Sequence, residues 1–341
     1  MNNLSSELTE GAERTLSYFE SKLLANGSYD TEVIDIAAYY KSPMMFVIAK
    51  KPNKALQILD YVKTNFMQTN GDFLSSISEK SINPAYSEFW TYTNGWIVRA
   101  AQLLGHEDIS IPASAFLDKF KSPIQGGFLT HQLASQDGVT DVLTAAHNGL
   151  IHLERGDIET AVNAGHYLCD VIELQPNLSD GFYLRLDSQK KLITSFTKDK
   201  EAFHWVNRTK PDQLYFMIGY SIGYLGLLFQ RTKDEKFLDA AHRYVDFVLS
   251  CHENIFSSNF SHKIAWACSV LFSIRPDEKL KSPMNFISHH FLASQSKEGI
   301  WFLDQDINTA YDQSAELACW FLEIAKNIEI GLKHTHTPRI R

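Results

Sequence analysis

Cysteine is scarce in this sequence, and its copies lie far apart. Only four occur among 341 residues, namely Cys169, Cys251, Cys268 and Cys319. None belongs to a C-x-x-C pair, the spacing that typically marks zinc and redox motifs. The Gly-rich loops that bind phosphate groups of nucleotides, G-x-x-x-x-G-K-[ST] and G-x-G-x-x-G, are also absent. We therefore expect reduced thiols, no metal site and no cofactor.

The sequence also lacks a long apolar run and an excess of positive charge, and its first residues do not predict a leader segment. Its longest apolar run, residues 214–229, is shorter than the ~20 residues that cross a bilayer, which predicts a buried helix and no membrane partner. The first residues show no basic start followed by an apolar stretch, which favours the cytoplasm over secretion. The formal net charge of −8 argues against nucleic acid as a partner, because such partners require a basic surface.

Helical periodicity, by contrast, is abundant and of two kinds. Hydrophobic residues make up 44% of the chain and charged residues 21%, which excludes disorder. In residues 54–66, the side chains of Ala55, Ile58, Val62 and Phe66 form one apolar stripe, as expected for a helix that covers a core from outside. Other segments, such as the longest apolar run, are apolar on nearly every side. Those segments predict helices that are buried all round.

The two kinds of helix alternate along the chain, with six of each. The one-sided, outer helices are expected near residues 5–24, 53–67, 111–121, 158–173, 234–252 and 281–295. The inner helices are expected near residues 33–50, 87–104, 141–154, 210–231, 261–274 and 309–328. Turns from inner to outer helices are short, whereas the opposite connections are longer. A recurring helical hairpin of this kind is typical of a repeat architecture.

Polar residues recur at a constant spacing in the inner segments. A spacing of 53 residues links two series, Lys41, Asn94 and His147, and then Lys210, Lys263 and Glu316. Ten additional residues separate the series, and the alternating pattern of residues 182–196 there predicts a small β-hairpin. A closed ring would supply the interior wall that the inner helices require. We therefore predict an all-α fold, a single (α/α)6 toroid over residues 1–332, followed by a flexible C-terminal tail over residues 333–341.

One segment supports the ring by its resemblance to a known family. The stretch Gln295-Ser-Lys-Glu-Gly299-Ile-Trp301 resembles the Q-x-x-x-G-x-W repeat of terpenoid cyclases, and the segments Gln68–Phe73 and Gln125–Phe128 resemble degenerate copies. Terpenoid cyclases share an α/α toroid with protein prenyltransferases, so the resemblance implies that fold and a central cavity. Their D-x-D-D and D-D-x-x-D motifs are absent. The layout is also similar to that of six-hairpin glycosidases and sugar epimerases.

The starts of the inner helices and the long connections should meet at one face of a toroid. Among the residues there, His147 lies between small neighbours and titrates near neutrality, which suits a general base. Glu316 has apolar neighbours in sequence, which would raise its pKa and suit a general acid, and Asp312 is a further candidate catalytic carboxylate. The alternatives are that His147 is a core residue hydrogen-bonded to a backbone carbonyl and that Glu316 pairs with Lys263 or Lys41.

The same positions also suggest how a substrate would bind. Three lysines, Lys41, Lys210 and Lys263, occupy equivalent positions, which favours an anionic ligand near the helix N-termini. The alternative is that acidic neighbours neutralise them, for which the candidates are Asp35, Glu88, Asp141, Asp212 and Asp312. Further substrate-binding candidates are polar or aromatic residues early on inner helices, namely Tyr40, Glu88, Trp90, Asn94 and Trp266.

Together these features predict a cytoplasmic enzyme that acts on a small anionic organic substrate by acid–base chemistry. Cyclisation or isomerisation is the preferred reaction, because the sequence resembles a cyclase and has no nucleophile motif. A sugar-active toroid, either a hydrolase or an epimerase, is the first alternative. A non-catalytic toroid that binds a ligand or a protein is the second. The sequence carries no indication of the oligomeric state.

Overall fold

The computed structural model describes residues 1–31, 35–122, 126–135 and 137–336. Three parts of the predictions lie outside these ranges. They are Gln125 of the degenerate repeat, the expected start of an inner helix near residue 33, and residues 337–341 of the expected tail. Within the described ranges, no helix is both long and apolar enough to span a bilayer.

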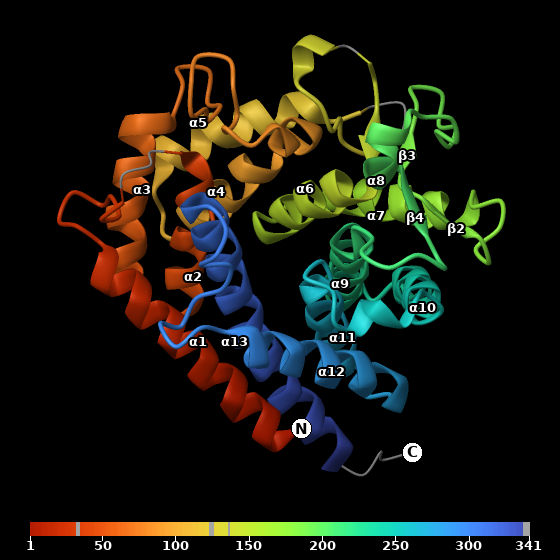
Figure 1. Cartoon of the computed structure of the whole chain (residues 1–341). Helices are drawn as coiled ribbons and strands as arrows, with labels where there is room; N and C mark the ends of the chain where they lie inside the picture. Colours follow the sequence, from red (N-terminus) through yellow and green to blue (C-terminus); the bar gives the residue numbers. More distant parts are fainter. Residues whose placement is uncertain (32–34, 123–125, 136, 337–341) are drawn as a thin grey trace.

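Twelve principal helices form six hairpins around a central axis (Figure 1). The outer helices are α1 (Asn2–Lys22), α3 (Pro52–Phe66), α5 (Glu107–Leu117), α7 (Ile158–Glu173), α10 (Glu235–Leu249) and α12 (Glu278–Ser294). The inner helices are α2 (Ser42–Ile48), α4 (Tyr92–Leu103), α6 (Val142–Glu154), α9 (Tyr215–Thr232), α11 (His262–Ile274) and α13 (Ile307–His336). The predicted (α/α)6 toroid is confirmed.

Burial follows the two kinds of periodicity seen in the sequence. On α10, Phe237, Ala241, Tyr244 and Val248 are buried along one face, while charged residues occupy the other. Every residue of α11 from His262 to Ser273 is buried, as expected for a helix enclosed by its neighbours. The apolar stripes of the outer helices therefore cover a wall of inner helices, and hydrophobic burial holds the two layers together.

Two inner helices depart from the expected bounds. Helix α9 begins at Tyr215 rather than near residue 210, because Pro211 and Asp212 form part of a loop and Asp212 has a left-handed backbone with φ of 52°. Helix α13 continues to His336, beyond the boundary at residue 332 that the sequence suggested for the tail.

Short 3-10 helices and strands lie in the connections. The 3-10 helices are η1 (Ile36–Ala38), η2 (Pro84–Phe89), η3 (Asp118–Phe120), η4 (Leu133–Ser135), η5 (Lys198–Lys200) and η6 (Glu253–Phe256). A short helix, α8 (Glu201–His204), follows η5. The strands are β1 (Thr140–Asp141), β2 (Gly181–Tyr183), β3 (Arg185–Leu186) and β4 (Trp205–Asn207), and they pair antiparallel as β1 with β3 and β2 with β4.

The β-hairpin expected near residues 182–196 is present in a short form, in which Leu186 pairs antiparallel with Leu192. Asp187 N–H donates to the Lys191 carbonyl at 2.9 Å, and Ile193 N–H donates to the Arg185 carbonyl at 3.0 Å. The two strands at its start pair with other segments of the chain instead of extending this hairpin. The insertion is thus tied into the connection before α6 and the connection before α9.

Ring closure depends on the Q-x-x-x-G-x-W segment. The Gln295 Nε2 amide lies 2.9 Å from the Gly11 carbonyl and 3.0 Å from Thr15 Oγ1 of α1, and 2.8 Å from the Gly299 carbonyl. Thr15 Oγ1 donates to the same Gly299 carbonyl at 2.7 Å. Trp301 Nε1 donates to a carbonyl of α12 at 2.8 Å. The first helix is therefore joined to the last hairpin, and α1 lies beside α13 (Figure 1).

Gly299 tests this closure because it combines two constraints. Its φ of 92° is a left-handed value, and a Cβ there would lie 2.7 Å from the Arg14 backbone of α1. Gly156 has a similar φ of 86° but no atom within 4 Å of such a Cβ. The free energy of unfolding of Gly156→Ala should therefore fall only by the cost of a left-handed alanine, ~1–2 kcal/mol. That of Gly299→Ala should fall by the same amount and by a further ~1–3 kcal/mol because the new methyl group overpacks the contact with α1.

Urea unfolding of the two variants measures this difference directly. Equal losses of unfolding free energy would contradict the view that the close contact between α1 and the last hairpin stabilises the ring.

Candidate functional site

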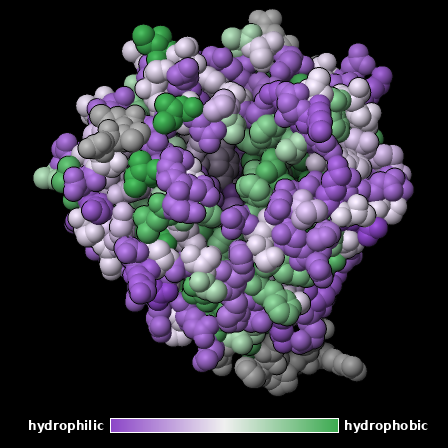
Figure 2. All heavy atoms as spheres, in the orientation of Figure 1, coloured by the Kyte–Doolittle hydropathy of each residue, from purple (hydrophilic) through white to green (hydrophobic). Residues whose placement is uncertain are grey.

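A pocket of about 360 Å³ lies where the long connections meet the first turns of the inner helices. Figure 2 shows a hollow near the centre of the ring with hydrophobic side chains along one side. The long connections and the inner helices contribute the residues that line the pocket. They are Tyr40, Lys41, Asn83, Ala85, Tyr86, Phe89, Tyr92, Leu143, Ala202, Phe203, Leu214, Phe216, Phe260, His262, Lys263, Thr309, Asp312, Gln313 and Glu316.

The pocket contains a buried cluster of charges centred on Glu316. Lys263 Nζ lies 2.5 Å from Glu316 Oε1, and Lys41 Nζ forms an ion pair with Glu316 Oε2. Lys41 Nζ also pairs with Asp312 Oδ1 at 2.8 Å. The Tyr92 hydroxyl donates to Glu316 Oε1 at 3.2 Å. Lys41, Lys263, Asp312 and Glu316 are all buried, so water screens these interactions weakly.

These contacts overturn the predicted role of Glu316 as a general acid. Burial alone would raise the pKa of its carboxyl group, but Lys263 and Lys41 hold that pKa well below its usual range. Glu316 is therefore a carboxylate at neutral pH. The alternative stated from the sequence, that Glu316 pairs with Lys263 or Lys41, describes the structure.

The two lysines differ because their partners differ. Burial would lower the pKa of Lys41, but the combined charges of Asp312 and Glu316 raise it above 10.5. Burial lowers the pKa of Lys263 to about 8; Glu316 opposes this shift and the charge of Lys41 adds to it. Lys41 is thus a permanent cation, whereas Lys263 can lose its proton near physiological pH.

His262, next to Lys263 on α11, was not among the predicted site residues. Its Nδ1 lies 3.2 Å from the Asn259 carbonyl oxygen, which can only accept a hydrogen bond, so Nδ1 carries the proton. Its Nε2 is therefore unprotonated; it lies 3.1 Å from Lys263 Nζ, from which it accepts a hydrogen bond, and 3.5 Å from Glu316 Oε1. Burial and the charge of Lys263 lower the pKa of His262, so the ring is neutral at pH 7.

Aromatic rings form most of the remaining wall. The Tyr40 ring meets Tyr86 and Tyr92 edge-on, with centroids 5.9 Å and 6.1 Å away. Burial raises the pKa values of these three phenols well above 10, so each keeps its hydroxyl proton. Phe89 and Phe203 meet edge-to-face, with ring centroids 5.7 Å apart. The pocket therefore offers apolar ring faces, neutral hydroxyl groups and a compact ion cluster.

His147 lies outside the pocket wall, contrary to the prediction that it acts there as general base. Its side chain is fully buried, and Nδ1 lies 2.8 Å from the Tyr220 hydroxyl. It packs between Tyr92 and Trp96 with ring centroids 4.7 Å and 6.1 Å away. Burial and the nearby Arg99 lower its pKa well below 6.5. The structure supports the alternative that His147 is a core histidine, although the hydrogen bond at its Nδ1 is to the Tyr220 hydroxyl and not to the expected backbone carbonyl.

Trp90 and Asn94, two further predicted ligand residues, belong to a separate buried cluster. Trp90 Nε1 and Asn94 Nδ2 each donate to Asp72 at 3.0 Å. Lys80 also pairs with Asp72 and donates to Asn94 Oδ1 at 2.7 Å. These side chains satisfy one another and do not line the pocket.

Glu88, Trp266 and Lys210 are also displaced from the pocket. Glu88 pairs with Arg185 at 2.9 Å, and Trp266 stacks against Trp320 with centroids 4.4 Å apart. The side chain of Lys210 is 58% exposed and lies 3.4 Å from Glu201. Lys210 is outside because α9 starts later than expected. Of the predicted site residues, the structure brings Tyr40, Lys41, Lys263, Asp312 and Glu316 together.

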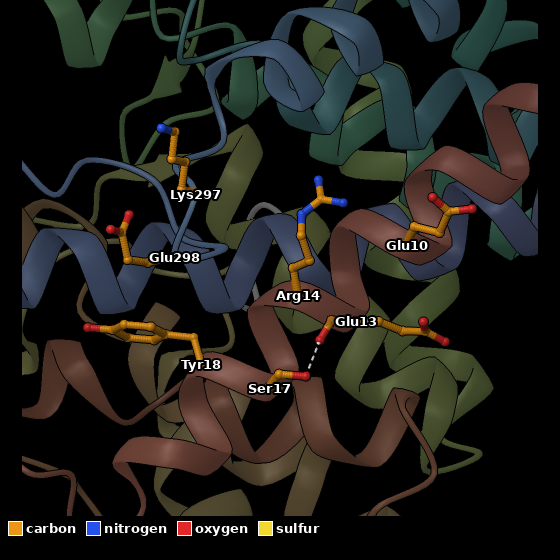
Figure 3. A pocket seen from close by; sticks show the side chains of 7 residues that line it. All are labelled: Glu10, Glu13, Arg14, Ser17, Tyr18, Lys297 and Glu298. Atoms are coloured by element: carbon orange, nitrogen blue, oxygen red, sulfur yellow. Dashed lines mark hydrogen bonds between the residues drawn. The ribbon is translucent and has the colours of Figure 1, made fainter.

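A second hollow, of about 520 Å³, lies on the outside of α1 (Figure 3). It is lined by charged residues of α1, namely Glu10, Glu13 and Arg14, and by Lys297 and Glu298 of the connection between α12 and α13. The side chains of these residues are exposed. Water competes for such groups, so they do not form a binding site comparable with the buried cluster. In the described part of the chain, no set of three or more His, Cys, Asp and Glu side chains is arranged to hold a metal ion.

No protein-family model matches this chain, and no curated protein matches its sequence significantly. Solved structures do match its fold. A D-mannose isomerase aligns with a TM-score of 0.66 and 11% identity over 92% of this chain and 96% of that chain. An alpha-1,6-mannanase of Salegentibacter aligns with a TM-score of 0.60 and 14% identity, covering 94% and 99% of the two chains.

A type II terpene cyclase from Scytonema, in complex with geranylgeranyl dihydroxybenzoate, aligns with a TM-score of 0.58 and 12% identity, covering 96% of this chain and 100% of that chain. These similarities concern the fold alone. They confirm that the fold of this chain resembles both the toroid of a terpene cyclase and the toroids of a mannose isomerase and a mannanase.

Glu316→Gln should destabilise the fold, because Lys41 and Lys263 would lose a charged partner inside the protein. Breaking a buried ion pair typically costs ~3–5 kcal/mol, and we expect a loss of this size at pH 7. The folded pKa of Glu316 is depressed, so its contribution is present above the unfolded value of 4.5 and is lost as the pH falls below it.

Urea unfolding at pH 7 and pH 3.5 checks both statements. The variant should lose less stability on acidification than the wild type. Glu298→Gln, at an exposed carboxylate, is the control and should leave stability nearly unchanged. If Glu316→Gln behaved like this control at pH 7, the central role of the ion cluster would be wrong.

Proposed function

We propose that this protein is an enzyme that moves a proton at the carbon next to a carbonyl group in a small hydroxy-carbonyl compound, as in the isomerisation or epimerisation of an aldose. The observation that carries the proposal is His262. It offers an unprotonated Nε2 in a buried pocket, with its tautomer held by the Asn259 carbonyl and with Lys263 Nζ as its hydrogen-bond partner.

The roles follow from the geometry. His262 Nε2 takes the proton from the carbon next to the carbonyl, and the Lys41 and Lys263 ammonium groups stabilise the negative charge that develops on oxygen. Glu316, 3.5 Å from His262, stabilises the imidazolium that forms. His262 then returns the proton to the same carbon or to its neighbour. His262 thus replaces His147 and Glu316 in the acid–base role.

The charge balance of the pocket favours an uncharged substrate over the anion expected from the lysines. Lys41 and Lys263 carry two positive charges, and Asp312 and Glu316 carry two negative ones at contact distance. The volume of about 360 Å³ is near the lower end of the ~300–1,000 Å³ range of ligand pockets, which suits a monosaccharide. The aromatic rings would pack against the apolar face of such a sugar.

The same groups disfavour glycoside hydrolysis and terpenoid cyclisation, the reactions of the other two enzymes with similar folds. Glycoside hydrolysis needs one carboxyl group that is protonated, whereas Asp312 and Glu316 both pair with Lys41. The mannanase with a similar fold is described as inactive when two consecutive aspartates are replaced, and this sequence has no two consecutive aspartates. A carbocation intermediate of a cyclase would face two ammonium groups. The fold similarity to a D-mannose isomerase agrees with the proposed class.

Incubation with single aldoses in D2O tests the proposal. Wild-type protein should incorporate deuterium at C2 of at least one aldose, measured by NMR, since proton transfer at that carbon is the proposed step. His262→Asn should slow this exchange by ~10²–10⁴-fold, as expected for a lost general base. Because the pKa of His262 is lowered, activity should fall only when the pH drops below the ordinary histidine range.

His289→Gln serves as the matched control, because His289 lies on the outer helix α12 and its side chain is half exposed. This variant should exchange at the wild-type rate. The absence of C2 exchange across a panel of aldoses, or full activity of a folded His262→Asn variant, would contradict the proposal.

A further inference from the structure

The two lysines of the pocket compete unequally for the carboxylates. Lys41 contacts two of them, Asp312 and Glu316, whereas Lys263 contacts Glu316 alone. The two ammonium groups lie beside the same carboxylate and therefore repel each other. Loss of a proton from Lys263, which has fewer carboxylate partners, removes this repulsion at the lower cost in free energy. A buried lysine next to a second cation is the environment that activates amines as nucleophiles in enzymes.

A proton acceptor, His262, lies next to the amino group of Lys263. His262 Nε2 lies 3.1 Å from Lys263 Nζ and accepts a hydrogen bond from it, so it can take the proton along this contact. The rings of Phe216 and Tyr92 lie 4.9 Å and 5.6 Å from Nζ and keep water away. The charged and titratable groups that face Nζ are Glu316 and Asp312 from α13, Lys41 before α2, Tyr92 from α4 and His262 of its own helix.

We infer that Lys263 is a carbonyl-reactive amine, which forms a reversible imine with the aldehyde group of an open-chain hydroxyaldehyde in this pocket. The identity of the substrate as a carbonyl compound rests on the proposed function; the reactivity of the amine rests on the contacts of Lys263. A pKa of about 8 leaves roughly a tenth of the amine unprotonated at pH 7.

The step balances with water as its only by-product. The lone pair of Lys263 Nζ attacks the carbonyl carbon and forms the C–N bond as the C–O double bond becomes single. One nitrogen proton passes by way of His262 Nε2 to the oxygen, which gives the carbinolamine. The C–O bond then breaks, the second nitrogen proton leaves with the hydroxyl group as water by the same relay, and the imine remains. On this route the protonated imine, instead of a carbonyl oxygen beside the Lys263 ammonium group, accepts the electron pair when the next carbon loses its proton. Reprotonation and hydrolysis by water return the amine and the aldehyde.

This route selects between the two reactions of the proposed function. Epimerisation at C2 restores the same imine, which water can hydrolyse. Isomerisation to a ketose would leave the sugar attached to Lys263 as a stable amine, because its C1 would no longer be double-bonded to nitrogen. An imine at Lys263 therefore points to interconversion of C2 epimers.

Reductive trapping with a small probe tests the inference. The full chain is treated briefly with glycolaldehyde and sodium cyanoborohydride at several pH values, and the modified lysines are mapped by peptide mass spectrometry. Lys263 should be modified first, with a rate that rises with pH and has its midpoint near 8. Lys41, held by two carboxylates, should stay unmodified at pH 7. Modification that follows surface exposure, with Lys263 unreacted, would overturn the inference.

Lys263→Arg separates this inference from the proposed function, because arginine keeps the positive charge beside Glu316 but forms no imine. In the folded variant, confirmed by circular dichroism, C2 exchange should fall to background. If C2 exchange persisted in Lys263→Arg, the imine would be wrong and the proposed function would stand. If wild-type Lys263 were trapped but no aldose exchanged at C2, the amine would stand and the proposed function would fail.

Discussion

The carboxylate of Glu316 connects the ring to its pocket. It contacts Lys41 before α2, Tyr92 on α4, Lys263 on α11 and Trp320 on its own helix, so one buried group holds segments from four of the six hairpins. A buried charge is costly unless its partners are in place. The positions of these four inner segments are therefore coupled, and the shape of the pocket depends on the ion cluster within it.

The same cluster makes two identical side chains chemically different. Lys41, with two carboxylate partners, stays protonated, whereas Lys263 titrates near neutrality. Environments that separate the pKa values of like groups typically mark acid–base assignments in active sites. Here the separation arises from the number of carboxylates that each lysine contacts. It leaves one pair, His262 and Lys263, able to exchange protons within a pocket that has no excess charge.

The α/α toroid itself does not select the reaction. Structures with this fold include a D-mannose isomerase, an alpha-1,6-mannanase and a terpene cyclase, all less than 15% identical to this chain. Function on a shared fold depends on the groups of the site. In this chain the pocket contains two lysines, two carboxylates and a histidine, and both carboxylates pair with Lys41.

The sequence alone determined the helices and their two layers, because apolar periodicity and repeat spacing are local properties. It also pointed to Lys41, Lys263 and Glu316, which all line the pocket. It also placed the Q-x-x-x-G-x-W segment, although not its role in closing the ring. Tertiary structure decided the ionisation of Glu316. Its apolar neighbours in sequence suggested a raised pKa, but its partner Lys41, which lowers that pKa, is 275 positions away. Tertiary structure also decided that His147 forms a hydrogen bond with the Tyr220 hydroxyl and that the side chain of Lys210 is exposed. Local patterns establish which residues share a helix face, but charges act through space on whichever groups the folded chain brings within reach.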